Sequence, residues 1–265
     1  MTARTENLPF GLLIHASYNA MNTLEIRRSP PKQCEDSQVH EGDPDDNVES
    51  QLSPARLKNS LNATERRTAA AIAGHLNDVA TARQLLDDED PDVRATALGA
   101  LNRLQNLTEA ELLSGLRDQH TLVLRRALRE SVRWQGDIDT PITNTIAQQI
   151  TELLNHPDPL VVEAAAWASG ERPTLDSTID RLMQLVEHHE DALVRESAVA
   201  ALGAIGNERA LPVILLATND RATVRRRAII ALAPFSGDDV DAALQKALSD
   251  RDWQVRQAAE DLLAE

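Results

Sequence analysis

A short repeated unit constrains the fold of this chain more than any other feature. Its clearest copy, residues 191–206, reads DALVRESAVAALGAIG. Six further copies are recognisable, and the residues at the valine position of the unit are Glu65, Val93, Leu124, Val161, Val194, Val224 and Val255. These residues are spaced from 28 (Glu65 to Val93) to 37 (Leu124 to Val161) positions apart. Such a step is too long for one helix and is typical of two helices joined by a turn, so the sequence predicts about seven helical hairpins.

The first helix of each predicted hairpin has its own start signal. Thr108 and Glu111 have the spacing of a capping box. Proline follows a cap residue at residues 53–54 and 140–141, where its fixed φ suits the first helical position. The other predicted caps are Asp78, Ser177, Asn207 and Asp239. Apolar residues at helical spacing follow each of these signals, as in residues 142–154.

The repeated residues each have a physical role in a stack of hairpins. The valine and a leucine seven or eight residues later face the neighbouring hairpin, and the alanine allows two helices to approach closely. The glycine near the end permits the left-handed turn that terminates a helix. The arginines align as Arg66, Arg94, Arg125, Arg195, Arg225 and Arg256. Two roles are open for them: ion pairs with turn aspartates that join neighbouring repeats, which we favour, or a row of ligand contacts.

The pattern D-x-x-V-R-x-x-A-x-x-A-L-G-x-I-G resembles the HEAT-like repeat, also called the phycobiliprotein-lyase repeat. The resemblance covers residues 53–265 and implies an all-α, right-handed α-solenoid whose second helices line a concave side. Val162 in the arginine position, the weak copy around Leu124 and the insertion at residues 135–140 depart from the pattern. The family includes scaffolds, regulators, lyases and DNA-repair enzymes, so the resemblance defines the fold better than the function.

Residues 1–52 lack any sustained helical or strand periodicity. Seven acidic residues and no lysine or arginine lie between Glu35 and Glu49. Such a segment cannot bury enough apolar surface to offset its ordering entropy. We therefore predict a disordered acidic tail over 1–52 and a repeat domain over 53–265. Translation could begin at Met1 or at Met21.

The charge composition narrows the class of partner. The net charge is −15, arginine outnumbers lysine by 24 to 3, and aromatic residues make up 2% of the chain. An acidic, lysine-poor surface of this kind resembles proteins that work in molar salt, where screening over about 3 Å removes long-range repulsion. No segment has the length of a membrane span and no signal peptide is recognisable, so we expect a cytoplasmic protein. The single cysteine, Cys34, cannot form an internal disulfide.

The sequence contains no recognisable catalytic or cofactor motif. It has no phosphate-binding loop, no nucleophile elbow and no dinucleotide fingerprint. The histidines of the repeats lie near turns of different hairpins and lack the spacing of a metal site. They are His75, His120, His156, His188 and His189. We expect surface histidines, no metal and no cofactor, which favours binding over catalysis.

A basic cluster and two tryptophans are the candidate binding residues. Arg126, Arg129 and Arg133 follow helical spacing i, i+3, i+7 and are followed by Trp134. Trp167 lies in the repeat without the arginine, and Arg226 lies in a second arginine run. Arginine and tryptophan are the types that dominate binding hot spots. Internal ion pairs for the arginines and packing for the tryptophans remain open alternatives.

These observations favour an interaction scaffold that binds a protein partner on its concave face. Two alternatives remain. The first is a nucleic-acid-binding protein similar to the HEAT-like DNA glycosylases, which line a groove with tryptophan, arginine and aspartate. The second is a small-molecule enzyme similar to the bilin lyases. The sequence names neither the partner nor the oligomeric state.

Overall fold

Every regular element of the described residues is helical. The computed structural model describes residues 58–60, 62–136 and 141–264, and these contain thirteen α-helices and two short 3₁₀ helices. Seven helices carry the repeated unit and are called second helices. They are α4 (Ala63–Leu76), α6 (Pro91–Arg103), α8 (Thr121–Arg133), α10 (Pro159–Gly170), α12 (Ala192–Ile205), α14 (Ala222–Ala231) and α16 (Trp253–Ala264).

Six first helices alternate with them along the described chain. These are α5 (Val79–Gln84, continued by the 3₁₀ helix Leu85–Asp87), α7 (Glu109–Gly115), α9 (Pro141–Leu153), α11 (Asp176–His188), α13 (Leu211–Ala217, preceded by the 3₁₀ helix Glu208–Ala210) and α15 (Asp238–Ala247). Each first helix and the second helix after it form one hairpin. The described residues therefore hold six complete hairpins and α4, which is the second helix of a seventh. The predicted α-solenoid is confirmed, whereas the predicted tail and the boundary at residue 53 lie outside the described residues.

Three of the five predicted start signals in the described part of the chain cap their helices, and those at residues 53 and 140 lie outside it. Thr108 and Glu111 form both hydrogen bonds of a capping box at α7, and the side chains of Asp78 and Asn207 accept backbone N–H groups at the starts of α5 and the 3₁₀ helix before α13. The predictions for Ser177 and Asp239 were wrong. Helix α11 begins one residue before Ser177, and α15 begins at Asp238 behind Gly237. Gly237 has φ +126°, a conformation that a side-chain cap residue rarely adopts.

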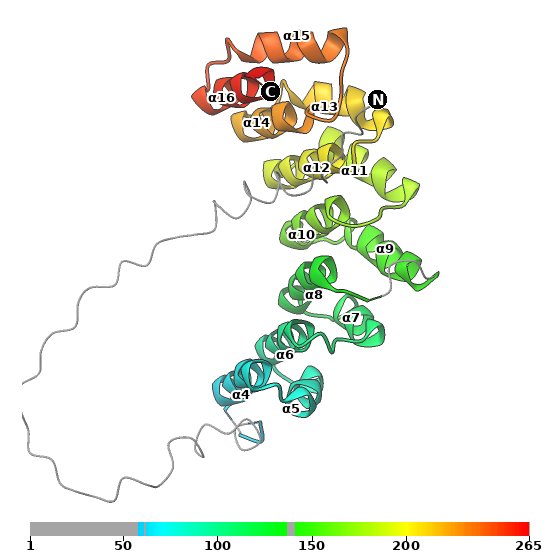
Figure 1. The fold of residues 1–265 in the computed structure, drawn as a ribbon, viewed down its shortest axis with the longest axis vertical. Coiled ribbons are helices and arrows are strands. Elements are labelled where there is room, and N and C mark those ends of the chain that lie inside the picture. The colour runs from blue at the N-terminus through cyan, green and yellow to red at the C-terminus, as the bar shows by residue number, and fades with distance from the viewer. Residues whose placement is uncertain (1–57, 61, 137–140, 265) are drawn as a thin grey trace, which may run out of the picture. The chain divides into compact units, whose positions relative to one another are not determined.

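The second helices stack directly on one another, as the column from α4 to α16 in Figure 1 shows. Small residues make this possible. A Cβ added to Gly203 would lie 2.6 Å from Cα of Ala231 on the next helix, and one added to Gly170 would lie 3.0 Å from Cα of Ala201. Backbones this close leave no room for larger side chains. The alanine and glycine positions of the repeat therefore set the distance between consecutive hairpins.

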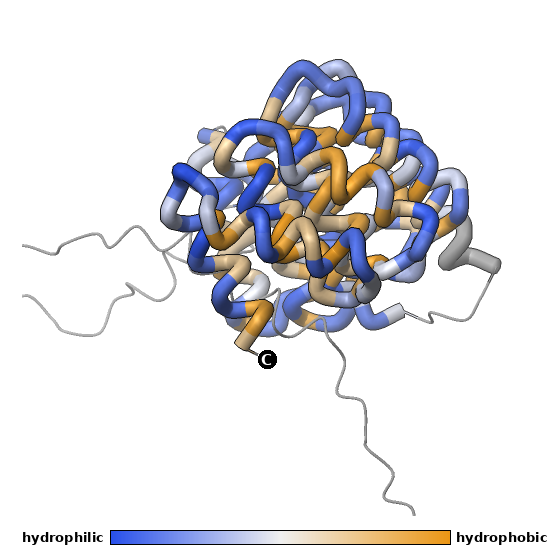
Figure 2. The backbone as a smooth tube through the Cα atoms, turned by 90° about the horizontal axis from the view of Figure 1, so that it is seen from above, coloured by the Kyte–Doolittle hydropathy of each residue, from blue (hydrophilic) through white to orange (hydrophobic). Residues whose placement is uncertain are grey.

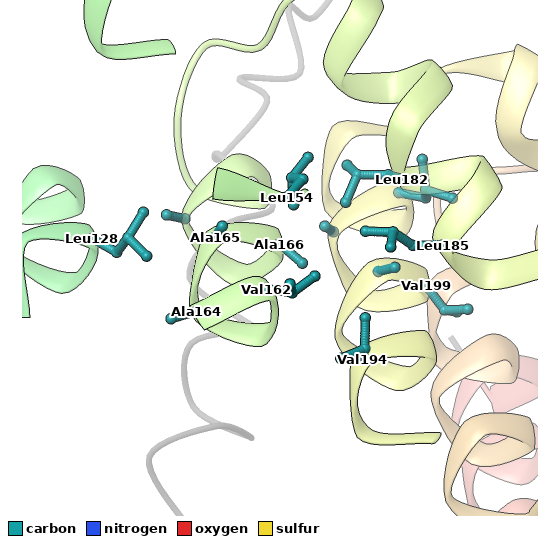
Figure 3. Close-up of a cluster of buried hydrophobic side chains, with 14 of the residues drawn as sticks. Leu128, Leu154, Val162, Ala164, Ala165, Ala166, Leu182, Leu185, Val194 and Val199 are labelled. Atoms are coloured by element: carbon teal, nitrogen blue, oxygen red, sulfur yellow. The ribbon is translucent and has the colours of Figure 1, made fainter. Parts of the chain in front are cut away.

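A large apolar cluster runs between the first and second helices, and a smaller one, formed by Ala69, Ala70, Leu85, Val93 and Ala97, lies at the N-terminal end of the described stack. Figure 2 shows the hydrophobic residues enclosed by hydrophilic ones. The close-up in Figure 3 shows the two sides of α10: Ala165 lies toward Leu128 of α8, and Val162 lies toward Val194 and Val199 of α12. All five side chains are buried. Each hairpin thus completes the core of its neighbours, as expected for a solenoid.

The structure corrects the register of the third repeat. In every second helix the backbone N–H of the fourth residue after the cap donates to the carbonyl of the cap residue. Arg94 donates to Asp90 and Arg195 to Asp191, and in α8 the corresponding bond joins Leu124 to His120. Leu124, not Arg125, therefore occupies the arginine position. The sequence alignment was displaced by one residue because it matched arginine to arginine.

Candidate interaction surface

A ladder of bidentate ion pairs joins neighbouring repeats. Nε and Nη2 of an arginine in one second helix donate to both carboxylate oxygens of an aspartate in the turn of the next hairpin, at 2.7–2.9 Å. The four pairs are Arg66–Asp88, Arg94–Asp118, Arg195–Asp220 and Arg225–Asp250. The structural role that we favoured for these arginines is confirmed at four junctions, so they are not available to a ligand.

Each ladder arginine also donates to a main-chain carbonyl of its own turn. Nη1 of Arg195 donates to the carbonyls of His189 and Glu190 at 2.7 and 3.0 Å, and Arg94 has the same contacts in its own turn. The hydrogen bonds from Arg195 lower the pKa of Asp220, and those from Arg225 lower the pKa of Asp250. These aspartates are not the cap residues of the helices that follow them. Asp88, Asp118 and Asp250 lie two residues before the cap, and Asp220 lies one residue before it.

The ladder is interrupted at the two central junctions. Leu124 in α8 and Val162 in α10 replace the arginine, and the acceptor positions of the following turns hold His156 and His189. At each of these junctions the arginine and its aspartate acceptor are therefore both replaced. Nδ1 of each histidine accepts the backbone N–H two residues later, at 3.0 and 3.1 Å, which is the turn contact that Asp250 makes elsewhere. Within the described residues, α8 and α10 are therefore joined to the next hairpin without an arginine–aspartate pair.

Arg126 is built into the junction between α6 and α8. A Cβ added to Gly99 would lie 1.5 Å from its Nη2, so the guanidinium occupies the space that a side chain would need there. Its Nε lies 2.6 Å from a carboxylate oxygen of Glu130, although the atoms are not aligned as a hydrogen bond. Glu130 also accepts a hydrogen bond from Asn102 at 2.6 Å and is buried. Arg126 consequently has a structural role, while 38% of its side chain remains exposed.

Arg129 and Arg133 differ from the other predicted arginines. Both are exposed on the same stripe of α8, and neither forms an ion pair or hydrogen bond with any described residue. Arg226 on α14 also has no such partner, but it is partly buried and lies beyond α10 and α12. The described part of the chain therefore leaves two adjacent arginines of α8 unpaired at its surface and places Arg226 apart from them.

The two tryptophans have different surroundings. Trp134 is the residue that ends α8. Its indole Nε1 donates to the carbonyl of Leu107 at 2.8 Å, so the indole is held against the loop that precedes α7. Trp167 is half-buried on α10. Counted from the caps, Trp167 is the ninth residue of α10, as Arg129 is of α8. The repeat therefore aligns Trp167 with the free arginines, whereas Trp134 packs elsewhere.

Three leucines on the same surface were missed by the sequence reasoning. Leu122, Leu160 and Leu193 are each the second residue after the cap in α8, α10 and α12, and each is 41–42% exposed. Together with Arg129, Arg133 and Trp167 they lie on the exposed side of three consecutive second helices. We call this set the central face. Comparison of cap-aligned repeats could have found it, because the leucines recur at one position.

No catalytic arrangement is apparent in the described residues. They contain no cluster of three metal-ligating side chains. A depression of about 760 Å³ lies between Arg94, Arg117 and His120. In its lining Arg94 pairs with Asp118, and Arg117 donates a hydrogen bond to Gln149 at 2.7 Å. None of the described helices has the length and apolar character needed to cross a membrane.

Comparison with known proteins identifies the repeats. Residues 146–233 match the family described as HEAT repeats. Over 81 residues the chain is 38% identical to a protein of Pseudanabaena tenuis (strain PCC 7409) named uncharacterized phycocyanin operon protein Z. That match covers 30% of this chain and 39% of the relative, so the chain spans about two fifths of the relative's length.

Solved structures share the architecture at low sequence identity. The N-terminal domain of Mot1, solved in complex with TBP, superimposes with a TM-score of 0.60 at 15% identity. The alignment covers 98% of this chain and 39% of the Mot1 chain. An engineered protein has a TM-score of 0.50 at 19% identity, covering 80% of this chain and 66% of its own. Likenesses of this kind define the fold alone.

Proposed function

Since the chain is a HEAT-like repeat protein, we propose that it is an interaction scaffold that binds a protein partner on the central face of α8, α10 and α12. The related fold of Mot1, solved in complex with TBP, is consistent with a protein ligand for such a stack. The partner-binding residues that we assign are Arg129, Arg133 and Trp167, with the exposed part of Arg126 beside them.

One observation carries this assignment. In a chain with 42 acidic residues, Arg129 and Arg133 share one exposed stripe of α8 and have no carboxylate partner among the described residues. The ladder arginines are paired bidentately, and the exposed Arg221 and Arg251, which also form no ion pair with a described residue, lie singly in separate turns. An exposed arginine without a carboxylate partner contributes little or nothing to the stability of the fold, so stability does not explain Arg129 and Arg133. A binding role does, because arginine offers five directional donors to a partner.

Trp134 and Arg226 are left out of the proposed site. Trp134 is held by the carbonyl of Leu107, and Arg226 lies three second helices away from α8. The proposed surface is therefore narrower than the set of residues that the sequence indicated.

The proposal is tested by affinity capture from native lysate at high salt, with the full chain as bait. Arg129→Glu combined with Arg133→Glu should lose the captured partner while the far-ultraviolet circular dichroism and the melting temperature stay the same. The matched control is Arg221→Glu with Arg251→Glu, which makes the same charge change in two exposed turns. Capture that survives the first pair, or that is lost equally with the control pair, would place the interface elsewhere.

A further inference from the structure

The central face is electrically polarised along the stack. On α8 its exposed stripe carries Arg126, Arg129 and Arg133, and the acid of this helix, Glu130, is buried beneath Arg126. No described residue pairs with the second and third of these arginines. Helix α8 therefore presents two exposed unpaired positive charges and part of a third.

The next two helices present an apolar surface bordered by carboxylates. On α10, Trp167 is preceded by Glu163 and followed by Glu171, each four residues away and therefore on the same stripe. On α12, Ala200 and Ala204 take the equivalent positions. The row of exposed leucines at the second position continues across all three helices. The positive charge of the central face is thus confined to α8.

This distribution favours a partner of mixed chemistry over one of uniform negative charge. A nucleic-acid strand laid across α8, α10 and α12 would meet arginines on the first helix and the carboxylates of Glu163 and Glu171 on the second. Glu196 on α12 adds a third, and each of these three acids also has a partner of its own, which for Glu196 is Arg227 at 3.5 Å. Phosphates along the whole strand would be attracted at one end only.

We propose that the central face binds a polypeptide segment that is acidic over α8 and apolar over α10 and α12. This inference rests on the proposed function and specifies its partner. Carboxylates of the segment accept hydrogen bonds from the guanidinium groups of Arg129 and Arg133. Apolar side chains then cover Trp167 and the exposed leucines Leu160 and Leu193.

The repeat geometry sets the spacing of this segment. Packed helices lie about 8–10 Å apart, and an extended chain advances about 3.3 Å per residue, so an extended segment passes one helix about every three residues. A segment of about nine residues covers the three helices. Its apolar residues are consequently expected at intervals of about three, following the acidic ones in the direction from α8 to α12.

The test uses a random peptide library of about 12-mers displayed on phage and selected on the full chain in 1 M KCl. Peptides that also bind Arg129→Glu/Arg133→Glu are removed. We expect the survivors to carry Asp or Glu at one end and Leu-type residues at the other. Failure to recover peptides, or recovery of basic or charge-free sequences, would overturn the proposal.

Recovered peptides are then measured by fluorescence anisotropy against single surfaces. Arg129→Glu/Arg133→Glu should weaken binding by about tenfold or more, corresponding to about 1.4 kcal/mol. Leu160→Ser with Leu193→Ser should weaken it by a similar factor, and Arg221→Glu with Arg251→Glu by less than about twofold. Equal loss with the turn control, or tighter binding of oligothymidylate than of peptide, would also contradict the assignment.

The lysate experiment separates the two levels of the proposal. If capture from lysate depends on Arg129 and Arg133 but the library yields no acidic–apolar peptides, the surface is correct and the partner chemistry is wrong. If the library yields such peptides but lysate capture does not depend on these arginines, the surface has the stated chemistry and the scaffold function fails.

Discussion

The arginine–aspartate ladder makes a quantitative prediction about stability. In the Arg195–Asp220 pair, Nε and Nη2 lie 2.7 and 2.8 Å from the two carboxylate oxygens, and the side chains are 13% and 20% exposed. Removing one partner of a fully buried pair costs about 3–5 kcal/mol, whereas exposed pairs contribute about 0–1 kcal/mol. For this intermediate exposure we expect Arg195→Gln and Asp220→Asn each to lower the free energy of unfolding by about 2–3 kcal/mol.

The double variant measures the interaction between Arg195 and Asp220 apart from their contacts with other residues. If the two residues act mainly on each other, Arg195→Gln/Asp220→Asn should cost less than the sum of the single variants by about 1–3 kcal/mol. Urea unfolding followed by circular dichroism measures these differences, and native-state hydrogen exchange of α12 and α14 locates them. In a folded body of about 200 residues the single variants should lower the melting temperature by about 5–10 °C.

Arg256 supplies the control within the same chain. Its Nη1 donates to the carbonyls of Asp250 and Arg251 at 2.7 and 3.3 Å, as the ladder arginines do in their own turns. No described carboxylate accepts from its Nε or Nη2. Arg256→Gln should therefore cost less than about 1 kcal/mol. A coupling energy near zero for Arg195 and Asp220, or an equal cost for Arg256→Gln, would refute the idea that the ladder stabilises the stack.

Further predictions concern packing, the interrupted ladder, pH and salt. Gly203→Ala should destabilise by about 2 kcal/mol or more in thermal melts, because its Cβ would meet backbone, whereas Gly99→Ala meets only the end of a flexible side chain and should cost less than about 1 kcal/mol. Val162→Arg should destabilise alone and regain about 1–3 kcal/mol with His189→Asp, as measured by urea unfolding. Since the pKa of Asp220 is lowered in the fold, its contribution is present above about pH 4 and lost as pH falls through the lowered pKa, so acid titration of stability should be shallower in the Arg195→Gln variant. The melting temperature of the wild type should rise between 0.1 and 3 M KCl, because a net charge of −15 repels itself when screening is weak.

The fold could be predicted because the residues that pack between hairpins recur at the same positions of the repeats. The valine, alanine and leucine positions of a second helix are buried in nearly every copy, for example Val93, Ala97 and Leu101. A pattern that recurs seven times tolerates one poor copy. Recurrence did not fix the alignment within the poor copy itself. That copy was aligned on Arg125, although Val123, Leu124 and Ala127 fit the buried positions of the repeat.

The candidate site was predictable only in part. Helical spacing alone placed Arg129 and Arg133 on one stripe. It could not show that Arg126 rests on Gly99, since that contact joins residues of two helices. The joint replacement of the arginine by Val162 and of its acceptor by His189 was also hidden, because the acceptor of each arginine lies in the following turn, before the residue that begins the repeated unit.

The interruption of the ladder and the unpaired arginines occur in the same repeat, and one physical reason connects them. At a complete junction the arginine four residues after the cap is bound by the next turn. In α8 that position is Leu124, and the next turn offers His156 in place of an acid. The arginines of α8 therefore lie at other positions, where the following hairpin provides no carboxylate. Arg126 lies against Gly99 of the preceding second helix and beside Glu130 of α8 itself, and Arg129 and Arg133 remain at the surface. A chain that pairs one arginine internally at each of four junctions thus leaves Arg129 and Arg133 unpaired on a central repeat. From this position a bound segment can contact hairpins on both sides.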